Sequence, residues 1–129
     1  MSLSLHQLMW VAIGGGCGAM ARFALSAWVN SLSSSAFPWG TYVVNFLGSC
    51  LFGVLFVLVF ANQPHREMLR LLLLVGFLGA FTTFSTFSFE TVRLMESGYW
   101  WLAAGNIIAS VASCIMGAWV GMGVARMIS

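Results

Sequence analysis

The sequence predicts an all-α membrane protein whose 129 residues form a single domain of four transmembrane helices. Hydrophobic residues make up 60% of the chain and charged residues only 6%, whereas about 25% of the residues in a soluble domain are charged. A helical crossing of the bilayer needs roughly 20 apolar residues, so this length allows four crossings with short loops. The alternating pattern of a membrane β-barrel is absent. Membrane lipid is therefore an expected partner.

The first span is expected at 5–29 and is rich in glycine. Gly14 and Gly18 have the GxxxG spacing that lets two helix backbones approach closely. Arg22 lies well inside this span, where a charge is costly unless the side chain extends to the interface or finds a partner. No positively charged segment precedes the span, so we expect no cleaved signal peptide.

The second span is expected at 39–61, ending before Pro64 because proline cannot continue a helix. Asn45 lies inside it, and its amide has two N–H donors that an anion could use. An interhelical hydrogen bond is the alternative role. The fourth span is expected at 99–125 and carries polar residues at helical spacing, which form either a hydrated track or contacts between helices. These residues are Asn106, Ser110 and Ser113.

The third span is expected at 68–89 and contains small and polar residues in mid-membrane, which predict a broken helix. The residues concerned are Gly76, Gly79, Thr82, Thr83 and Ser85. Non-helical backbone at that depth is tolerated only where it is buried in protein or lines a water-filled cavity. Freed carbonyls there could bind a cation, and the N-terminus of a half-helix could attract an anion. An ordinary glycine and threonine packing face is the alternative.

Phe81, Phe84 and Phe87 recur every three residues in the same span and form an aromatic stripe. Such a stripe often serves packing. The edge of an aromatic ring is electropositive, however, so ring edges that point into a narrow pore could stabilise a small anion. The sequence alone leaves both roles open.

The few charges exclude some functions and leave the orientation open. Arg66, Arg70 and Arg126 fall on the membrane face of the termini, and Arg22 and Arg93 towards the opposite face. This near balance permits insertion in both orientations, and hence an antiparallel pair, as well as a single orientation. The arginines are scattered, so nucleic-acid binding is not expected. No Cys, His and carboxylate cluster has ligand or triad spacing, so we expect no enzyme.

Three ordered motifs cover most of the chain. They are 14–16 with Gly18 and Arg22, then 40–45, then 76–79 followed by 82–88 and Glu90. With these motifs the chain resembles the Fluc (CrcB) family of bacterial fluoride channels over essentially its whole length. The resemblance implies a multi-pass protein of the bacterial inner membrane and a dual-topology antiparallel homodimer. It also implies two fluoride pores and a structural sodium ion on the central axis.

The resemblance also implies roles for individual residues. The fluoride pore would contain Phe84, Phe87, Asn45, Ser85, Thr86 and Ser110. Gly79 and Thr82 would offer backbone carbonyls to sodium, and Arg22 matches the arginine of the family's first span. Relatives often carry hydroxyl groups further along the fourth span, where this chain has Cys114 and Ala118.

The expected function is a fluoride-selective channel that lets fluoride leave the cytoplasm passively and so lowers its toxicity. One alternative is a four-helix exporter of the small multidrug resistance type, which needs a carboxylate in the first span. That span contains Arg22 and no Asp or Glu. The other alternative is a structural subunit of a larger membrane complex, in which the glycines and aromatic residues serve packing alone.

Overall fold

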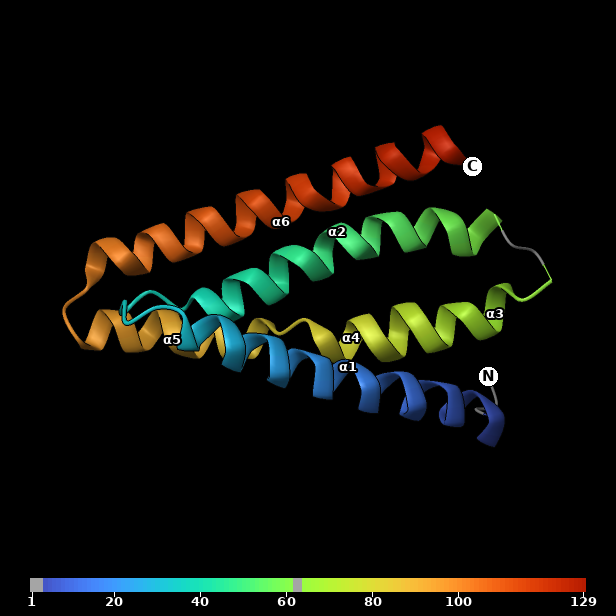
Figure 1. Ribbon diagram of the computed structural model, residues 1–129, viewed down its shortest axis with the longest axis horizontal. Coiled ribbons are helices and arrows are strands. Elements are labelled where there is room, and N and C mark those ends of the chain that lie inside the picture. Colours follow the sequence, from blue (N-terminus) through green and yellow to red (C-terminus); the bar gives the residue numbers. More distant parts are fainter. Residues whose placement is uncertain (1–3, 62–63) are drawn as a thin grey trace.

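The computed structural model describes residues 4–61 and 64–129, and these residues are almost entirely helical. Among them, four helical spans are long and apolar enough to cross a membrane: Leu5–Ser31, Trp39–Ala61, Arg66–Glu96 and Trp100–Ile128. No β-strand occurs in the described ranges. The prediction of an all-α protein with four membrane-spanning helices is confirmed. Figure 1 shows the spans lying along one axis, with the N- and C-terminal ends at the same end of the bundle.

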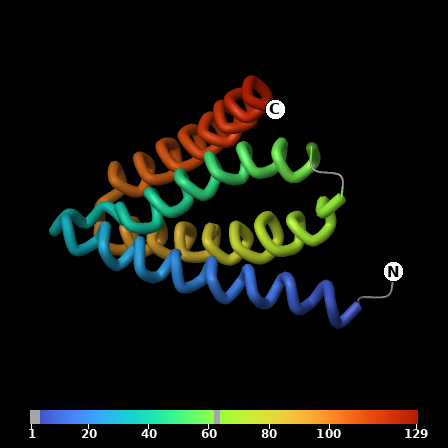
Figure 2. Tube along the Cα trace, turned by 45° about the vertical axis from the view of Figure 1, so that its right-hand side comes forward, coloured from blue at the N-terminus to red at the C-terminus, as the bar shows by residue number. Residues whose placement is uncertain are grey.

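Helix α1 (Leu5–Ser31) packs closely against the first half of the third span. A Cβ atom added at Gly14 would collide with the carbonyl oxygen of Leu72, and one added at Gly18 with the carbonyl oxygen of Phe77. The two helices lie side by side in both Figure 1 and Figure 2. The GxxxG pair therefore makes a contact between α1 and the third span that only glycine allows.

Helices α2 (Trp39–Ala61) and α6 (Trp100–Ile128) form a second close pair on the other side of the third span (Figure 2). A Cβ atom at Gly53 would meet the carbonyl oxygen of Ala118, and one at Gly121 would meet that of Cys50. A Cβ atom at Gly117 would lie 2.6 Å from the Cys50 sulfur. The small residues of both helices thus set their separation.

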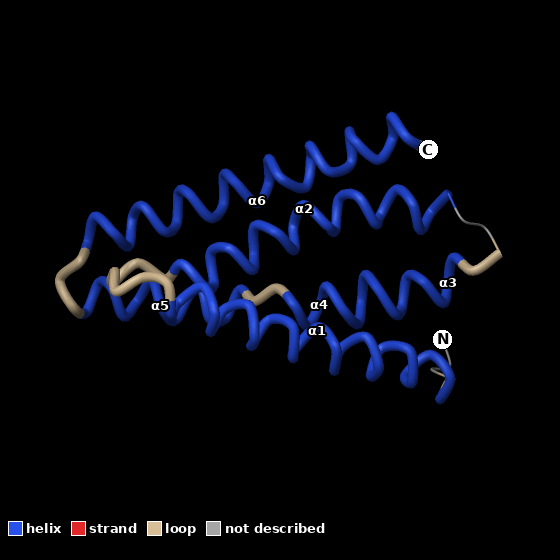
Figure 3. Tube along the Cα trace, viewed as in Figure 1, coloured by secondary structure: helices blue, strands red, loops and turns tan. Residues whose placement is uncertain are grey.

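The third span consists of several helical segments. It begins with α3 (Arg66–Leu69), a π-helix η1 (Arg70–Leu78) and a short α4 (Gly79–Phe81). Thr82 and Thr83 are extended, with ψ angles of 156° and 111°. Helix α5 (Phe84–Glu96) follows them. Figure 3 shows this extended pair as a loop between two helical segments.

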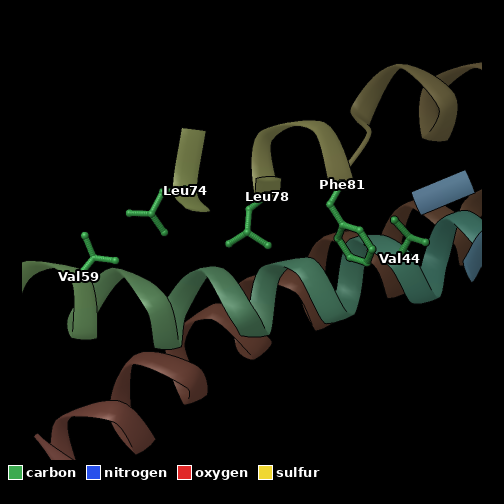
Figure 4. Packing of buried hydrophobic residues seen from close by; sticks show 5 residues of the cluster. All are labelled: Val44, Val59, Leu74, Leu78 and Phe81. Atoms are coloured by element: carbon green, nitrogen blue, oxygen red, sulfur yellow. The ribbon is translucent and has the colours of Figure 1, made fainter. Parts of the chain in front are cut away.

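The buried apolar core lies between α2 and the first half of the third span. Figure 4 shows its members on the facing sides of these elements: Val44, Val59, Leu74, Leu78 and Phe81. Phe81 is the last helical residue before the extended pair and is only 5% exposed. In lipid such contacts stabilise a bundle through close packing rather than through removal of apolar surface from water. The core therefore fixes the position at which α4 ends against α2.

Candidate functional site

The extended residues Thr82 and Thr83 are held by a side chain from α2. The Oδ1 atom of Asn45 accepts a hydrogen bond from the Thr83 N–H at 2.7 Å, and its Nδ2 donates to the Thr83 carbonyl at 3.0 Å. One amide therefore satisfies both backbone polar groups of a non-helical residue, as the interior of a membrane protein requires. In the described part of the chain the amide makes no other hydrogen bond, so its second N–H is available.

The extended pair also changes the partners of two backbone carbonyls. In an unbroken helix, the Thr83 N–H would bond the carbonyl of Gly79, but here it donates to Asn45. The N–H of Thr86 would bond the carbonyl of Thr82, but it donates to the Thr83 side-chain oxygen at 3.2 Å. The carbonyls of Gly79 and Thr82, which the family resemblance implies as sodium ligands, thus lack their helical donors.

Helix α5 begins directly after the extended pair, and Thr83 is its N-cap. The Thr83 hydroxyl donates to the Thr86 Oγ1 atom at 2.9 Å while its oxygen accepts from the Thr86 N–H. This capping orders the first turn of α5, where unpaired N–H groups give a helix its positive end. Phe84 is the first residue of that turn.

A groove of about 400 Å³ runs past this point between α2, α5 and α6. Five of the residues identified from the sequence line it: Asn45, Thr82, Phe84, Phe87 and Ser110. Cys114 and Ala118 line it as well. The fold therefore gathers residues from three separate spans into one place.

The two phenylalanines of the groove differ in their surroundings. Their ring centroids are 5.5 Å apart, with an angle of 42° between the ring planes. Phe84 is 77% exposed, whereas Phe87 is only 8% exposed. Phe87 is thus part of the packed interior, and Phe84 forms an open edge of the groove.

The polar residues of α6 do not share one environment. Ser110 lines the groove, and its hydroxyl donates to the Asn106 Oδ1 atom at 3.2 Å. Asn106 in turn donates to the Thr91 hydroxyl at 2.9 Å, and Thr91 donates to the Phe87 carbonyl at 2.7 Å. Ser113 lies in a different groove, on the other side of the α2 and α6 contact. The polar stripe of the fourth span is therefore partly a hydrogen-bonded contact between α5 and α6.

Thr91 is a residue of this site that the sequence patterns do not single out. It is 5% exposed and connects Asn106 to the backbone of Phe87. Its position four residues after Phe87, on the same helix face, is the available signal. Helical threonines commonly bond the carbonyl four residues earlier, so this signal is weak.

The remaining residues identified from the sequence lie outside the groove. Thr86 and Arg22 line a separate cavity of about 220 Å³ together with Thr41. The Nε atom of Arg22 is buried and has no hydrogen-bond partner among the described residues, so its surroundings leave this polar group uncompensated. Ser85 is exposed, with its hydroxyl 3.4 Å from that of Thr83. Gly79 lines another groove, beside Arg70.

Glu90 has one partner within the bundle. Its Oε1 atom accepts a hydrogen bond from the Thr41 hydroxyl at 3.0 Å. Its Oε2 atom is buried, and no residue in the described part of the chain bonds it. A charge at this point is thus only partly compensated by the residues around it.

Comparison with known proteins places the chain in a family. Residues 9–122 match the family described as CrcB-like protein, Camphor Resistance (CrcB). A protein of Magnetococcus marinus named fluoride-specific ion channel FluC is 52% identical over 95% of this chain and 99% of its own length. Proteins of the same name from Geobacter sulfurreducens and Hahella chejuensis are each 43% identical, over 95% and 98% of this chain and 98% and 99% of their own lengths. This chain belongs to the CrcB-like protein family.

Proposed function

We propose that this protein is a fluoride-selective ion channel of the bacterial inner membrane, through which fluoride leaves the cytoplasm passively. Hydrogen fluoride is a weak acid that enters cells uncharged and then dissociates, so a passive path for the anion lowers its toxicity. Relatives named fluoride-specific ion channel FluC, up to 52% identical over nearly the whole chain, support this function. No enzymatic step is involved.

The observation that carries the proposal is the meeting of Phe84, Phe87 and Asn45 in one groove. Fluoride is small and strongly hydrated, so a pore must replace its water with closely spaced hydrogen-bond donors and electropositive groups. The free N–H of Asn45 is such a donor, and the edges of the two rings are electropositive. A larger halide would not fit between closely spaced ring edges.

We assign supporting roles to the residues near the groove. Ser110 lines it directly, and Ser85 and Thr86 lie in the first turn of α5, beside Phe84. Arg22 and Thr86 share a separate cavity, which would serve as a vestibule where the positive charge of Arg22 attracts an anion. In this scheme the third span is a broken transmembrane helix, and its two extended threonines form the functional segment of the channel.

The groove supports a homodimer. In a single chain, Phe84 is 77% exposed, and the polar groups of Asn45 and Thr83 line a groove on the lipid-facing surface. An ion path with one side open to lipid does not conduct, so a second copy of this chain would cover it. The near balance of arginines at the two ends allows the copies to insert in opposite orientations. An antiparallel pair would contain two such paths.

We further propose a structural sodium ion at the dimer axis. The carbonyl oxygens of Gly79 and Thr82 lack their helical donors because Thr83 and Thr86 donate to side chains instead. Unpaired carbonyls at the C-terminal end of a half-helix are known to bind Na⁺ in membrane proteins. Sodium would coordinate these carbonyl oxygens and stabilise the extended pair without taking part in fluoride transport.

Purified protein in liposomes loaded with potassium fluoride tests the function. The liposomes should release fluoride rapidly once a potassium ionophore lets K⁺ leave with it and so balances the charge. Liposomes with the same protein that are loaded with potassium chloride should retain their chloride. Release of both halides at the same rate would contradict a fluoride-selective channel.

Crosslinking tests the dimer. Single cysteines placed near Phe84 should form crosslinks between two copies only at positions that an antiparallel pair brings together. Crosslinks at positions that only a parallel pair brings together would contradict the antiparallel dimer.

A further inference from the structure

The groove continues beyond Ser110 into a region where α6 contributes no hydroxyl group. The residues of α6 at this end are Cys114 and Ala118, and α2 faces them with Ser49 and Phe52. A thiol is a weak hydrogen-bond donor, and alanine has none in its side chain. An anion that passes this end of the groove therefore needs a donor from another element.

The other hydroxyl groups of the groove are already committed as donors. Thr82 donates to the Leu78 carbonyl at 3.0 Å. Thr83 donates to Thr86 at 2.9 Å, and Ser110 donates to Asn106 at 3.2 Å. A hydroxyl group has a single proton, so each of these would have to break a bond within the protein before it could donate to an ion.

The hydroxyl of Ser49 differs from these three because it makes no hydrogen bond to any residue in the described ranges. Some other helical serines bond back to a carbonyl of their own helix, as Ser88 does to the Phe84 carbonyl at 2.9 Å and Ser31 to the Trp28 carbonyl at 2.6 Å. Ser49 is half-buried and lines the groove, so its proton is free to point into it. It is the donor that this end of the groove otherwise lacks.

Ser49 also lies in register with the other free donor of the groove. It follows Asn45 by four residues on α2, which places both side chains on one helix face about 6 Å apart along the axis. Gly48, between them, lies against the break, because a Cβ atom there would meet the Thr82 methyl group. The free N–H of Asn45 and the O–H of Ser49 thus form two successive donors on the α2 wall.

We propose that Ser49 contacts the permeating anion directly and supplies, from α2, the hydrogen bond that Cys114 and Ala118 of α6 do not provide. This inference rests on the proposed fluoride channel and adds to it a second ion-binding step next to Asn45. An ion released by the Asn45 amide would be received by the Ser49 hydroxyl before it meets water.

Fluoride efflux from liposomes tests the proposal with four variants. Ser49→Ala should lower the fluoride flux by about tenfold, the effect of losing one hydrogen bond to a charged group. Ser49→Thr keeps the hydroxyl and should keep most of the flux. Ser49→Ala combined with Ala118→Ser moves a hydroxyl to the opposite wall of the groove and should recover part of the loss. Ser113→Ala is the matched control, because Ser113 lies in a different groove of the same bundle, and it should conduct like the wild type.

The outcomes separate this inference from the proposed function. Recovery by Ala118→Ser would support Ser49 as an ion contact, because a merely structural serine is not replaced from the opposite helix. Two results would overturn the role of Ser49 and leave the channel standing. One is a wild-type fluoride flux in Ser49→Ala. The other is a folded Ser49→Ala protein with reduced flux, when Ser49→Thr shows the same reduction and the added Ala118→Ser restores none of the flux. Wild-type protein that passes no fluoride would overturn the channel itself.

Discussion

The side-chain amide of Asn45 forms both backbone hydrogen bonds of Thr83, which lies 38 residues further along the chain. This pair joins α2 to the point where the third span leaves the helical conformation. Within the described residues the amide leaves one N–H without a partner, and Asn45 lines the groove, so under the proposed function the same residue holds the extended pair and would offer a donor to an anion. Structure and proposed transport therefore depend on a single side chain.

Asn45→Ala should lower both stability and fluoride flux. The substitution removes the partner of the part-buried Thr83 N–H and carbonyl, and an unpaired group costs up to about 1–3 kcal/mol when it is buried. The unfolding midpoint in detergent and the liposome flux would report the two effects. Asn30→Ala is the matched control, because Asn30 also bonds a backbone N–H, that of Gly40 at 2.8 Å, but lies outside the groove. It should lower the midpoint and preserve the flux, and equal flux losses in both variants would contradict the role of Asn45.

The two groove phenylalanines should respond differently to the same substitution. Phe84→Ile should lower the unfolding midpoint of the purified protein less than Phe87→Ile does, since within one chain the Phe84 ring is 77% exposed. Phe87→Ile should lower that midpoint, because the ring is only 8% exposed and the change of shape costs about 1–3 kcal/mol in a packed interior. Thermal unfolding of the two variants side by side would show the difference. Equal midpoints would mean that Phe87 is not packed as described.

Gly18→Ala should destabilise the bundle, whereas Gly16→Ala should not. A Cβ atom at Gly18 would collide with the Phe77 carbonyl oxygen, but one at Gly16 meets nothing within 4 Å. Forcing a methyl group into a tight contact costs about 1–3 kcal/mol. The unfolding midpoints of the two variants, which differ from wild type by the same single methyl group, would measure this cost. A Gly18→Ala protein as stable as Gly16→Ala would exclude the close packing of α1 on η1.

Removal of sodium should lower the unfolding midpoint of the purified protein. A ligand that binds only the folded state raises the free energy of unfolding by RT ln(1 + [L]/Kd), where [L] is the free ligand concentration. The unfolding midpoint should therefore rise with sodium concentration. N-methylglucamine at equal ionic strength is the control cation, because it is too large to lie between the carbonyls of Gly79 and Thr82. An unfolding midpoint that is the same in both salts would contradict the proposed sodium site.

Local composition predicts where the spans lie, but the third is helical well beyond its expected end at 89, to Glu96. The second span was expected at 39–61 and α2 occupies Trp39–Ala61, and the first was expected at 5–29 where α1 occupies Leu5–Ser31. Thr82 and Thr83 are extended and lie in the segment where small and polar residues are concentrated, whereas a functional break of the third span stays a prediction. The π-helix η1 was not anticipated, because its leucine-rich sequence is equally compatible with an α-helix.

The site could be predicted only in part. Asn45, Phe84 and Phe87 were identified by their resemblance to family motifs, and the structure brings them into one groove. The pairing of Asn45 with Thr83 and the free hydroxyl of Ser49 depend on how distant segments pack. No local pattern of residues encodes such a pairing.

The central claim is that fluoride passes through the groove beside Phe84, and a fluoride electrode that records efflux from liposomes tests it most directly. Wild-type protein and Phe89→Ile should release fluoride at the same rate, because Phe89 lies on the same helix, is 63% exposed and does not line the groove. Phe84→Ile should release it at least about tenfold more slowly, since an aliphatic side chain has no electropositive edge. Equal release by wild type and Phe84→Ile would show that the ion does not pass the Phe84 ring and would contradict the account.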